Sequence, residues 1–296
     1  MEANIKELLK PEILNTVDGL ELVARILVEG FMSGANKSQT IGSGHEFSQH
    51  RSYEPGDDLR QFDWKMYARS EKYFIKQAEV ETNITVKFMV DASHSMAYKE
   101  DGLSKLQYAK VMTASLAYLA RKQRDSFGLF IVNENHVSNV HARFEQQQFV
   151  RFLQSLVKAT AEGRWKKNGI EYLFDHQGKE MIIFFTDLYD DEGDLLHFIS
   201  RLKTKRNEVI VFHLMGKREM ELGFEGSVTF QDLENGSTLK VDTRAGQIKY
   251  SGRIQAWIKQ SRLSLLEKNI NYYMVSMGDN ISEVLRDFLK IRRNFR

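Results

Sequence analysis

The sequence predicts an α/β protein built on a doubly wound, mostly parallel sheet. Residues 181–186 and 209–214 are near-continuous apolar runs, which are typical of strands buried on both faces. Residues 84–90 are rich in β-branched and aromatic side chains and predict a third such strand. Helical periodicity alternates with these strands along the chain, and that alternation predicts a parallel sheet with helices on both faces. We expect these three strands to be central.

The remaining elements follow from local periodicity. The predicted elements, in order, are a helix over 4–29 interrupted near Pro11, a Gly/Ser-rich loop over 30–44, a helix over 103–123, strands over 127–132 and 137–140, a helix around 149–156, a short helix over 172–176, a helix over 195–202, a β-hairpin within 224–250, a helix over 254–266, a strand over 272–275 and a closing helix over 281–291. This pattern divides the chain into a helical and irregular N-terminal extension, residues 1–82, and an α/β domain with a hairpin insertion, residues 83–296.

Composition excludes several classes of protein. The net charge of +2 gives no reason to expect nucleic acid as a partner. The absence of cysteine excludes disulfides and thiolate metal sites. No apolar run approaches the ~20 residues that span a bilayer, and the first residues lack the apolar core of a signal peptide, so we expect a cytoplasmic protein. Neither a phosphate-binding P-loop nor a dinucleotide-binding glycine motif occurs, so no nucleotide cofactor is expected.

A candidate site begins where the strand over 84–90 ends. Asp91, Ser93 and Ser95 follow this strand at every second position. Polar residues that follow a strand of a doubly wound sheet lie at its carboxyl edge, where such sheets bind ligands. One carboxylate and two hydroxyls are hard oxygen donors, suited to Mg²⁺ or Mn²⁺. The alternative is that these residues cap the following loop and helix.

This D-x-S-x-S loop resembles the metal-ion-dependent adhesion site of von Willebrand factor A-like domains. The resemblance implies a metal with one open coordination position, which a carboxylate of a partner protein fills. Asp187, at the end of the strand over 181–186, would be the second acidic group of that site, or else the cap of a helix that begins near Asp190.

The loop before that strand departs from the adhesion-site pattern. The family supplies a threonine there in a Gly-Thr context, whereas the only threonine of this loop is Thr160, without that context. Arg164, Lys166 and Lys167 add positive charge to the same loop, which weakens a cation site.

A second signal lies between residues 51 and 69, where arginines, aspartates and one tryptophan interleave. The residues are Arg51, Asp57, Asp58, Arg60, Asp63, Trp64 and Arg69. Bidentate ion pairs among them would lock an irregular segment into a clasp against the α/β domain, with Trp64 as its apolar anchor. The alternative is a docking surface for a partner.

This spaced motif closely resembles the signature of domain-of-unknown-function family 58, in which it precedes an A-like Asp-x-Ser-x-Ser-Met loop. The resemblance extends from about residue 40 to about residue 290. Members of the family are commonly encoded beside MoxR-type AAA+ ATPases, which implies an accessory protein for a chaperone-like ATPase.

Three functional hypotheses follow. The first is a non-enzymatic interaction protein that binds a partner at the Asp91 edge, with or without Mg²⁺ or Mn²⁺. The second is a metal-dependent hydrolase that uses the same acidic edge; it lacks an evident nucleophile paired with a base, because the only histidine close to Ser93 is its sequence neighbour His94. The third is a scaffold that binds no metal.

Overall fold

The structure is a computed structural model that describes residues 7–36, 49–54, 62–77, 84–166, 179–190, 193–221, 227–231 and 238–293. The chain divides into two compact units. The sheet unit consists of Met1–Ser33 and Ile84–Arg296, and the small unit of Gly34–Asn83. In the described part of the chain, no helix combines the length and apolar character needed to cross a membrane.

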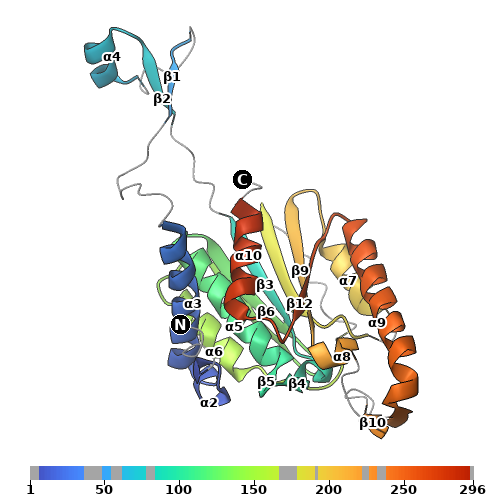
Figure 1. The fold of residues 1–296 in the computed structure, drawn as a ribbon. Helices are drawn as coiled ribbons and strands as arrows, with labels where there is room; N and C mark the ends of the chain where they lie inside the picture. The colour runs from blue at the N-terminus through green and yellow to red at the C-terminus, as the bar shows by residue number, and fades with distance from the viewer. Residues whose placement is uncertain are drawn as a thin grey trace. The chain divides into compact units, whose positions relative to one another are not determined.

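The sheet unit contains a six-stranded sheet with the order β12-β9-β8-β3-β6-β7 (Figure 1). Its strands are β3 (Thr85–Asp91), β6 (Ser126–Val132), β7 (Val137–Arg143), β8 (Glu180–Thr186), β9 (Asn207–Met215) and β12 (Asn271–Ser276). All neighbours are parallel except the edge strand β7, which runs antiparallel to β6. Counted along the chain the order is 3-2-1-4-5-6, so it reverses between β3 and β8. This arrangement confirms the predicted fold class and its three central strands.

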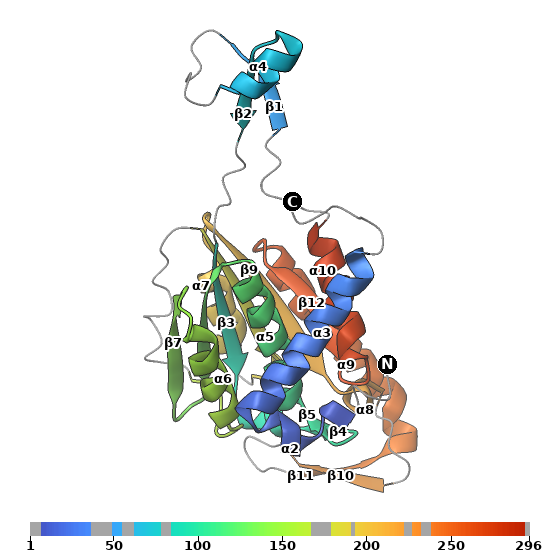
Figure 2. The ribbon, with the colours of Figure 1, turned by 90° about the vertical axis from the view of Figure 1, so that its left-hand side faces the viewer.

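Helices cover both faces of the sheet (Figures 1 and 2). On one face lie α3 (Val17–Asn36), α5 (Lys105–Lys122), α6 (Gln148–Lys158) and α10 (Ile281–Arg293); on the other lie α7 (Asp194–Leu202) and α9 (Thr243–Leu266). Strand residues alternate between the two cores: Ile183 and Phe185 join the core of the first face, whereas Ile182 and Phe184 join that of the second. Each apolar run is continuous because every residue of the strand has a core to enter.

The predicted extension over residues 1–82 needs a correction, because its first helix belongs to the sheet unit. The short helix α2 (Pro11–Leu14) and helix α3 contribute Leu14, Leu20, Ala24 and Val28 to the same core as β3 and α5. The helix also continues to Asn36, into the stretch predicted as a Gly/Ser-rich loop. The apolar stripe of this helix is therefore buried against the α/β domain itself.

Smaller elements follow the strands. A 3-10 helix, η2 (His94–Ala97), and the two-residue strands β4 (Lys99–Glu100) and β5 (Leu103–Ser104) connect β3 to α5, and α8 (Lys217–Glu221) follows β9. The predicted hairpin is confirmed as the antiparallel pair β10 (Ser227–Gln231) and β11 (Thr238–Asp242). Helix α9 starts at Thr243, eleven residues before the predicted start at Ile254. The predicted helix over 172–176 lies outside the described residues.

Candidate functional site

The candidate site lies at the point where the strand order reverses. Asp91 is the last residue of β3, and Asp187 directly follows the neighbouring strand β8. In an open α/β sheet the loops diverge at such a switch point, and ligands bind there. The side chains of Asp91, Ser93, Ser95 and Asp187 are brought together but are 0%, 0%, 7% and 3% exposed. The centre is therefore enclosed rather than open to solvent.

Asp91 is fixed by two hydrogen bonds, one to each carboxylate oxygen. The backbone N–H of Ser93 donates to Oδ1 at 2.9 Å, and the hydroxyl of Thr186 donates to Oδ2 at 2.8 Å. The Thr186 hydroxyl in turn accepts from the backbone N–H of Leu188 at 2.9 Å. Burial and the neighbouring Asp187 carboxylate raise the pKa of Asp91 to about 7, and these hydrogen bonds oppose the rise.

A chain of hydrogen bonds continues from the serines to a buried lysine. The Ser93 and Ser95 hydroxyls share a hydrogen bond of 3.0 Å, and Ser95 donates to Asp187 Oδ1 at 3.2 Å. Lys105 Nζ donates to the other oxygen of Asp187, Oδ2, at 2.9 Å and to Glu219 Oε1 at 2.8 Å. We call the set Asp91, Ser93, Ser95, Thr186, Asp187, Lys105 and Glu219 the polar centre.

Lys105 stays protonated in this environment. Burial alone lowers its pKa, but the carboxylates of Asp187 and Glu219 outweigh burial and the net shift is upward. The ring of Tyr98 faces the ammonium, with its centroid 5.2 Å from Nζ. Gly216 allows this packing, because a Cβ atom there would lie 2.5 Å from a Tyr98 ring carbon and 3.1 Å from Glu219 Oε2.

The loop over residues 159–166 is tied to the D-x-S-x-S loop through the backbone. The N–H of Glu162 donates to the carbonyl of Ala92 at 2.9 Å, and the N–H of His94 donates to the carbonyl of Gly163 at 2.7 Å. Trp165 anchors the loop in the core, with ring centroids 5.6 Å from Phe184 and 5.2 Å from Phe198.

The threonine at the polar centre is therefore Thr186, from the strand. Thr160, the threonine of the preceding loop, is exposed and lines a pocket.

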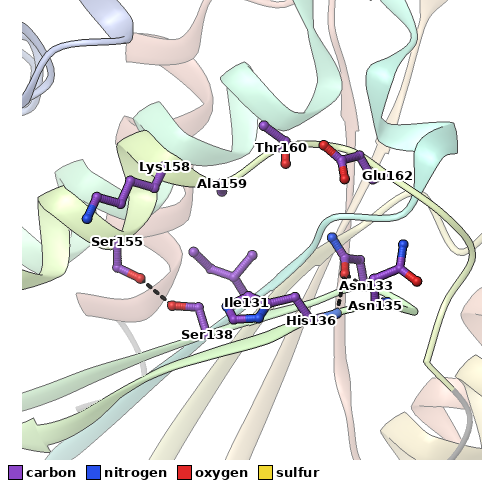
Figure 3. A pocket seen from close by; sticks show the side chains of 10 residues that line it. All are labelled: Ile131, Asn133, Asn135, His136, Ser138, Ser155, Lys158, Ala159, Thr160 and Glu162. Carbon is purple, nitrogen blue, oxygen red and sulfur yellow. Dashed lines mark hydrogen bonds between the residues drawn. The ribbon is translucent and has the colours of Figure 1, made fainter.

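That pocket, of about 240 Å³, lies at the ends of β6, β7 and α6 (Figure 3), and part of its lining comes from the loop over residues 159–166, which bonds to the D-x-S-x-S loop. Its lining residues are Ile131, Asn133, Asn135, His136, Ser138, Ser155, Lys158, Ala159, Thr160 and Glu162. The Ser138 and Ser155 hydroxyls share a hydrogen bond of 2.7 Å across its floor, and Asn133 Oδ1 accepts from the backbone N–H of His136 at 2.7 Å (Figure 3). Its lining mixes apolar and polar groups and carries one positive and one negative side chain, Lys158 and Glu162.

The predicted metal ligands are oxygen donors of the kind that Mg²⁺ prefers, but their carboxylate oxygens already accept hydrogen bonds from the protein. Each oxygen of the Asp91 and Asp187 carboxylates accepts at least one hydrogen bond from the protein, and Lys105 supplies a positive charge 2.9 Å from Asp187. Mg²⁺ also keeps several water ligands, for which an enclosed centre offers little room. Within the described residues, no group of three or more His, Cys, Asp or Glu is placed to hold a metal. This arrangement does not fit an added divalent ion.

The small unit contains the other predicted set only in part. Asp57, Asp58 and Arg60 lie outside the described residues, and Arg51 is on β1 (Gln49–Ser52), which pairs with β2 (Phe74–Gln77). Asp63 is buried and caps helix α4 (Trp64–Ser70) by accepting from the N–H groups of Lys65 and Met66, while Arg69 is exposed in its last turn.

Trp64 is not the buried aromatic of the small unit itself, and its predicted role as an anchor against the α/β domain stays a prediction. Within the small unit Trp64 is 68% exposed, at the first position of α4. The buried aromatic is Phe62, whose ring lies 4.6 Å from that of Trp64 and 5.7 Å from that of Tyr73. Both the clasp and the docking surface stay open as predictions for this segment.

Comparison with protein families decides the classification. The model of the family described as "Protein of unknown function DUF58" matches residues 49–260, well over half of the chain. The chain belongs to the DUF58 family. The match begins within the small unit and ends within α9, so it includes both the Arg/Asp segment and the polar centre.

Curated relatives of this DUF58 chain include uncharacterized proteins of Mycobacterium tuberculosis and Mycobacterium bovis. They are 23% identical over 233 residues, which cover 76% of this chain and 72% of the relatives.

Similar solved structures include three at low identity. The conserved hypothetical protein BatB from Bacteroides thetaiotaomicron has a TM-score of 0.45 at 14% identity and covers 72% of this chain and 100% of its own. An aerotolerance-related membrane protein from Bacteroides fragilis has a TM-score of 0.43 at 17% identity, with coverages of 70% and 98%. The SpRpn10 VWA domain has a TM-score of 0.39 at 11% identity, with coverages of 69% and 94%.

Sequence reasoning missed three members of the polar centre of this DUF58 protein. Thr186 directly precedes Asp187, and the sequence pattern marks it only as the last residue of the predicted strand. Lys105 carried a usable signal, because a lysine in the first turn of a helix opposes the helix dipole and needs a reason to be there. Glu219 carried none, since an acidic residue in the first turn of a helix such as α8 is ordinary.

Proposed function

We propose that this DUF58 protein is a non-enzymatic protein-interaction module, accessory to a MoxR-type AAA+ ATPase in chaperone-like assembly, and that its partner binds the loops at the carboxyl edge of the sheet. A cytoplasmic location is part of the proposal. Support for the ATPase comes from the family resemblance of the sequence motif.

The observation that carries the proposal is the burial of the polar centre at the switch point. Its hydrogen bonds join the loop after β3 to the loop after β8 and to helix α8, and backbone bonds add the loop over residues 159–166. Loops fixed in this way form a preorganised surface, and preorganisation reduces the entropy cost of binding. The centre thus supports a recognition surface instead of contacting the partner itself.

The pocket at the ends of β6, β7 and α6 supplies side chains that a partner can reach. Lys158, Glu162 and His136 lie on its rim, and all three are exposed. A rim with both charges and several amide and hydroxyl groups suits polar side chains of a protein partner. Rim charges set the rate and specificity of association more than they set its final affinity.

The hydrolase alternative is less well supported by this geometry. Ser93 and Ser95 are buried, and in the described structure their hydroxyls bond to each other and to Asp187 rather than to a histidine. A serine nucleophile needs an adjacent base and access to substrate. We therefore expect no hydrolysis of phosphoester or peptide substrates, with or without Mn²⁺.

The test is binding of the MoxR-type ATPase from the same organism, measured by biolayer interferometry. We expect Lys158→Glu to slow association about 5- to 10-fold, because it reverses a charge on the pocket rim. Lys268→Glu is the matched control: this lysine is also exposed but precedes β12 at the opposite edge of the sheet. Equal association rates for the two variants would place the partner elsewhere, and failure of the wild type to bind would exclude this ATPase.

A further inference from the structure

Lys105 occupies a position that is unfavourable for a lysine. It is the first residue of α5, after the cap Ser104, whose hydroxyl accepts from the N–H of Gln107 at 3.1 Å. The N-terminus of a helix carries partial positive charge, which repels a cation. The side chain is also only 4% exposed, so its ammonium has lost most of its hydration. A lysine with only a packing role would not need its charge here.

The surroundings of the ammonium compensate for that cost. Two carboxylates from different parts of the chain meet at Nζ: Asp187 at 2.9 Å, after β8, and Glu219 at 2.8 Å, on α8. Glu219 is itself oriented by the backbone N–H of Gly216, which donates to its other oxygen at 2.7 Å. The ring of Tyr98 covers the ammonium from another direction. The site is built to hold one cation at one place.

A path of hydrogen bonds links the ammonium of Lys105 to the two serines of the D-x-S-x-S loop. Asp187 connects Lys105 to Ser95, and the serine pair connects onward within the D-x-S-x-S loop. A divalent ion in such a loop would neutralise the two carboxylates and hold the loops together. We propose that the ammonium of Lys105 takes this role by pairing with Asp187 and Glu219, and that the bond from Ser95 to Asp187 ties the D-x-S-x-S loop to this pair, so that the polar centre of this protein is complete without a metal and its carboxyl edge does not respond to divalent ions.

This proposal is independent of whether the protein binds an ATPase, because its test uses the isolated chain and metal alone. The measurement is the melting temperature in EDTA and in 10 mM Mg²⁺ or Mn²⁺. For the wild type we expect the melting temperature to change by no more than about 1 °C, because the folded protein has no vacant site for the ion. For Lys105→Met we expect Mn²⁺ to raise the melting temperature by about 3–8 °C, because the freed carboxylates of Asp187 and Glu219 gain a cation.

Two variants control this experiment. Lys110→Met removes another buried lysine of α5, whose Nζ donates to the carbonyls of Val157 and Ala159 rather than to carboxylates. We expect it to lower stability without creating a response to Mn²⁺. Adding Asp187→Asn to Lys105→Met should abolish the acquired response, because it removes one of the two carboxylates that flank the vacated position.

Three outcomes would overturn the proposal. They are stabilisation of the wild type by either ion, a folded Lys105→Met that ignores Mn²⁺, and an acquired response that survives Asp187→Asn. If Lys105→Met folds only when Mn²⁺ is present, that rescue supports the proposal. If it does not fold at all, calorimetric titration of the wild type decides: a Mn²⁺ dissociation constant below about 1 mM contradicts the proposal, and no binding at that level supports it.

Discussion

His213 is a titratable side chain held neutral in the core next to the polar centre. It lies on β9, fully buried, with Nδ1 2.6 Å from the Tyr272 hydroxyl and its ring 5.1 Å from that of Trp257. Burial lowers the pKa of His213 from 6.5 to about 4; Asp187 opposes this shift and Lys105 adds to it. Its neutral form is thus part of the native structure.

The contribution of His213 to the free energy of unfolding should fall as the pH drops from about 6.5 to 4. In that window the unfolded chain binds a proton at residue 213 and the folded chain does not, so acid favours unfolding. A pKa shift of this size corresponds to a loss of about 3 kcal/mol of unfolding free energy once the pH has fallen to about 4. Urea denaturation at several pH values measures it.

The control for this prediction is His213→Gln, which keeps a polar partner for Tyr272 but does not titrate. The wild type must be compared with the variant because Asp91, whose pKa is raised to about 7, contributes a slope of opposite sign across this whole pH window. We expect the wild type to lose more stability than the variant between pH 6.5 and 4. Parallel pH profiles would show that His213 is protonated in the folded state.

At the residue scale, the sequence predicted which side chains gather but not what neutralises them. Asp91 and Asp187 each follow an apolar run, and adjacent parallel strands end at one edge, so their proximity follows from the topology. Lys105 is 82 residues from Asp187 and 114 residues from Glu219 along the chain. Their contacts depend on how a helix start and a short helix pack over the edge, which no local pattern specifies.

Helix α3 packs in the core of the sheet unit, although the sequence predicts it as part of the N-terminal extension. Leu20 is 0% exposed within the main core, whereas Ile26 of the same helix is 38% exposed. Leu20→Ala should therefore cost about 2–4 kcal/mol of unfolding free energy through lost burial and a cavity. Ile26→Ala, as the matched control, should cost less than about 1 kcal/mol.

Chemical denaturation followed by tryptophan emission in a Trp64→Phe background reports on the sheet unit, because the two remaining tryptophans, Trp165 and Trp257, both lie in it. If Leu20→Ala left that transition where Ile26→Ala leaves it, α3 would be an independent extension and the original domain division would stand.

The differences between predicted and observed elements have physical causes. The amphipathic stripe of α3 predicts that something covers it, but not which surface does so. The sequence predicts too late a start for helix α9. Its first part contains Gly246 and Gly252, which lower helix propensity and resemble turn signals. Tertiary packing overrides such propensities. The size of Trp64 predicts a buried anchor, and within the small unit its position at the start of α4 leaves that side chain uncovered.

For the whole molecule, the sequence predicts the class of sheet and its central strands, but it does not predict the position and direction of every strand. Alternating strands and helices predict a doubly wound parallel sheet, and the most apolar runs predict its centre. The antiparallel edge strand β7 has a mixed polar pattern that local periodicity describes poorly. The switch point between β3 and β8 then places the polar centre where the topology has a crevice.

Lys105, a residue of the chain itself, completes the polar centre at this switch point in the way described above. The most direct measurement is a crystal structure of the wild type grown with Mn²⁺, with anomalous scattering recorded to locate the ion. We expect Lys105 Nζ within hydrogen-bond distance of Asp187 and Glu219, and no anomalous peak among the oxygens of Asp91, Ser93, Ser95 and Asp187. A manganese peak bonded to those oxygens, with the Lys105 side chain displaced, would contradict the claim.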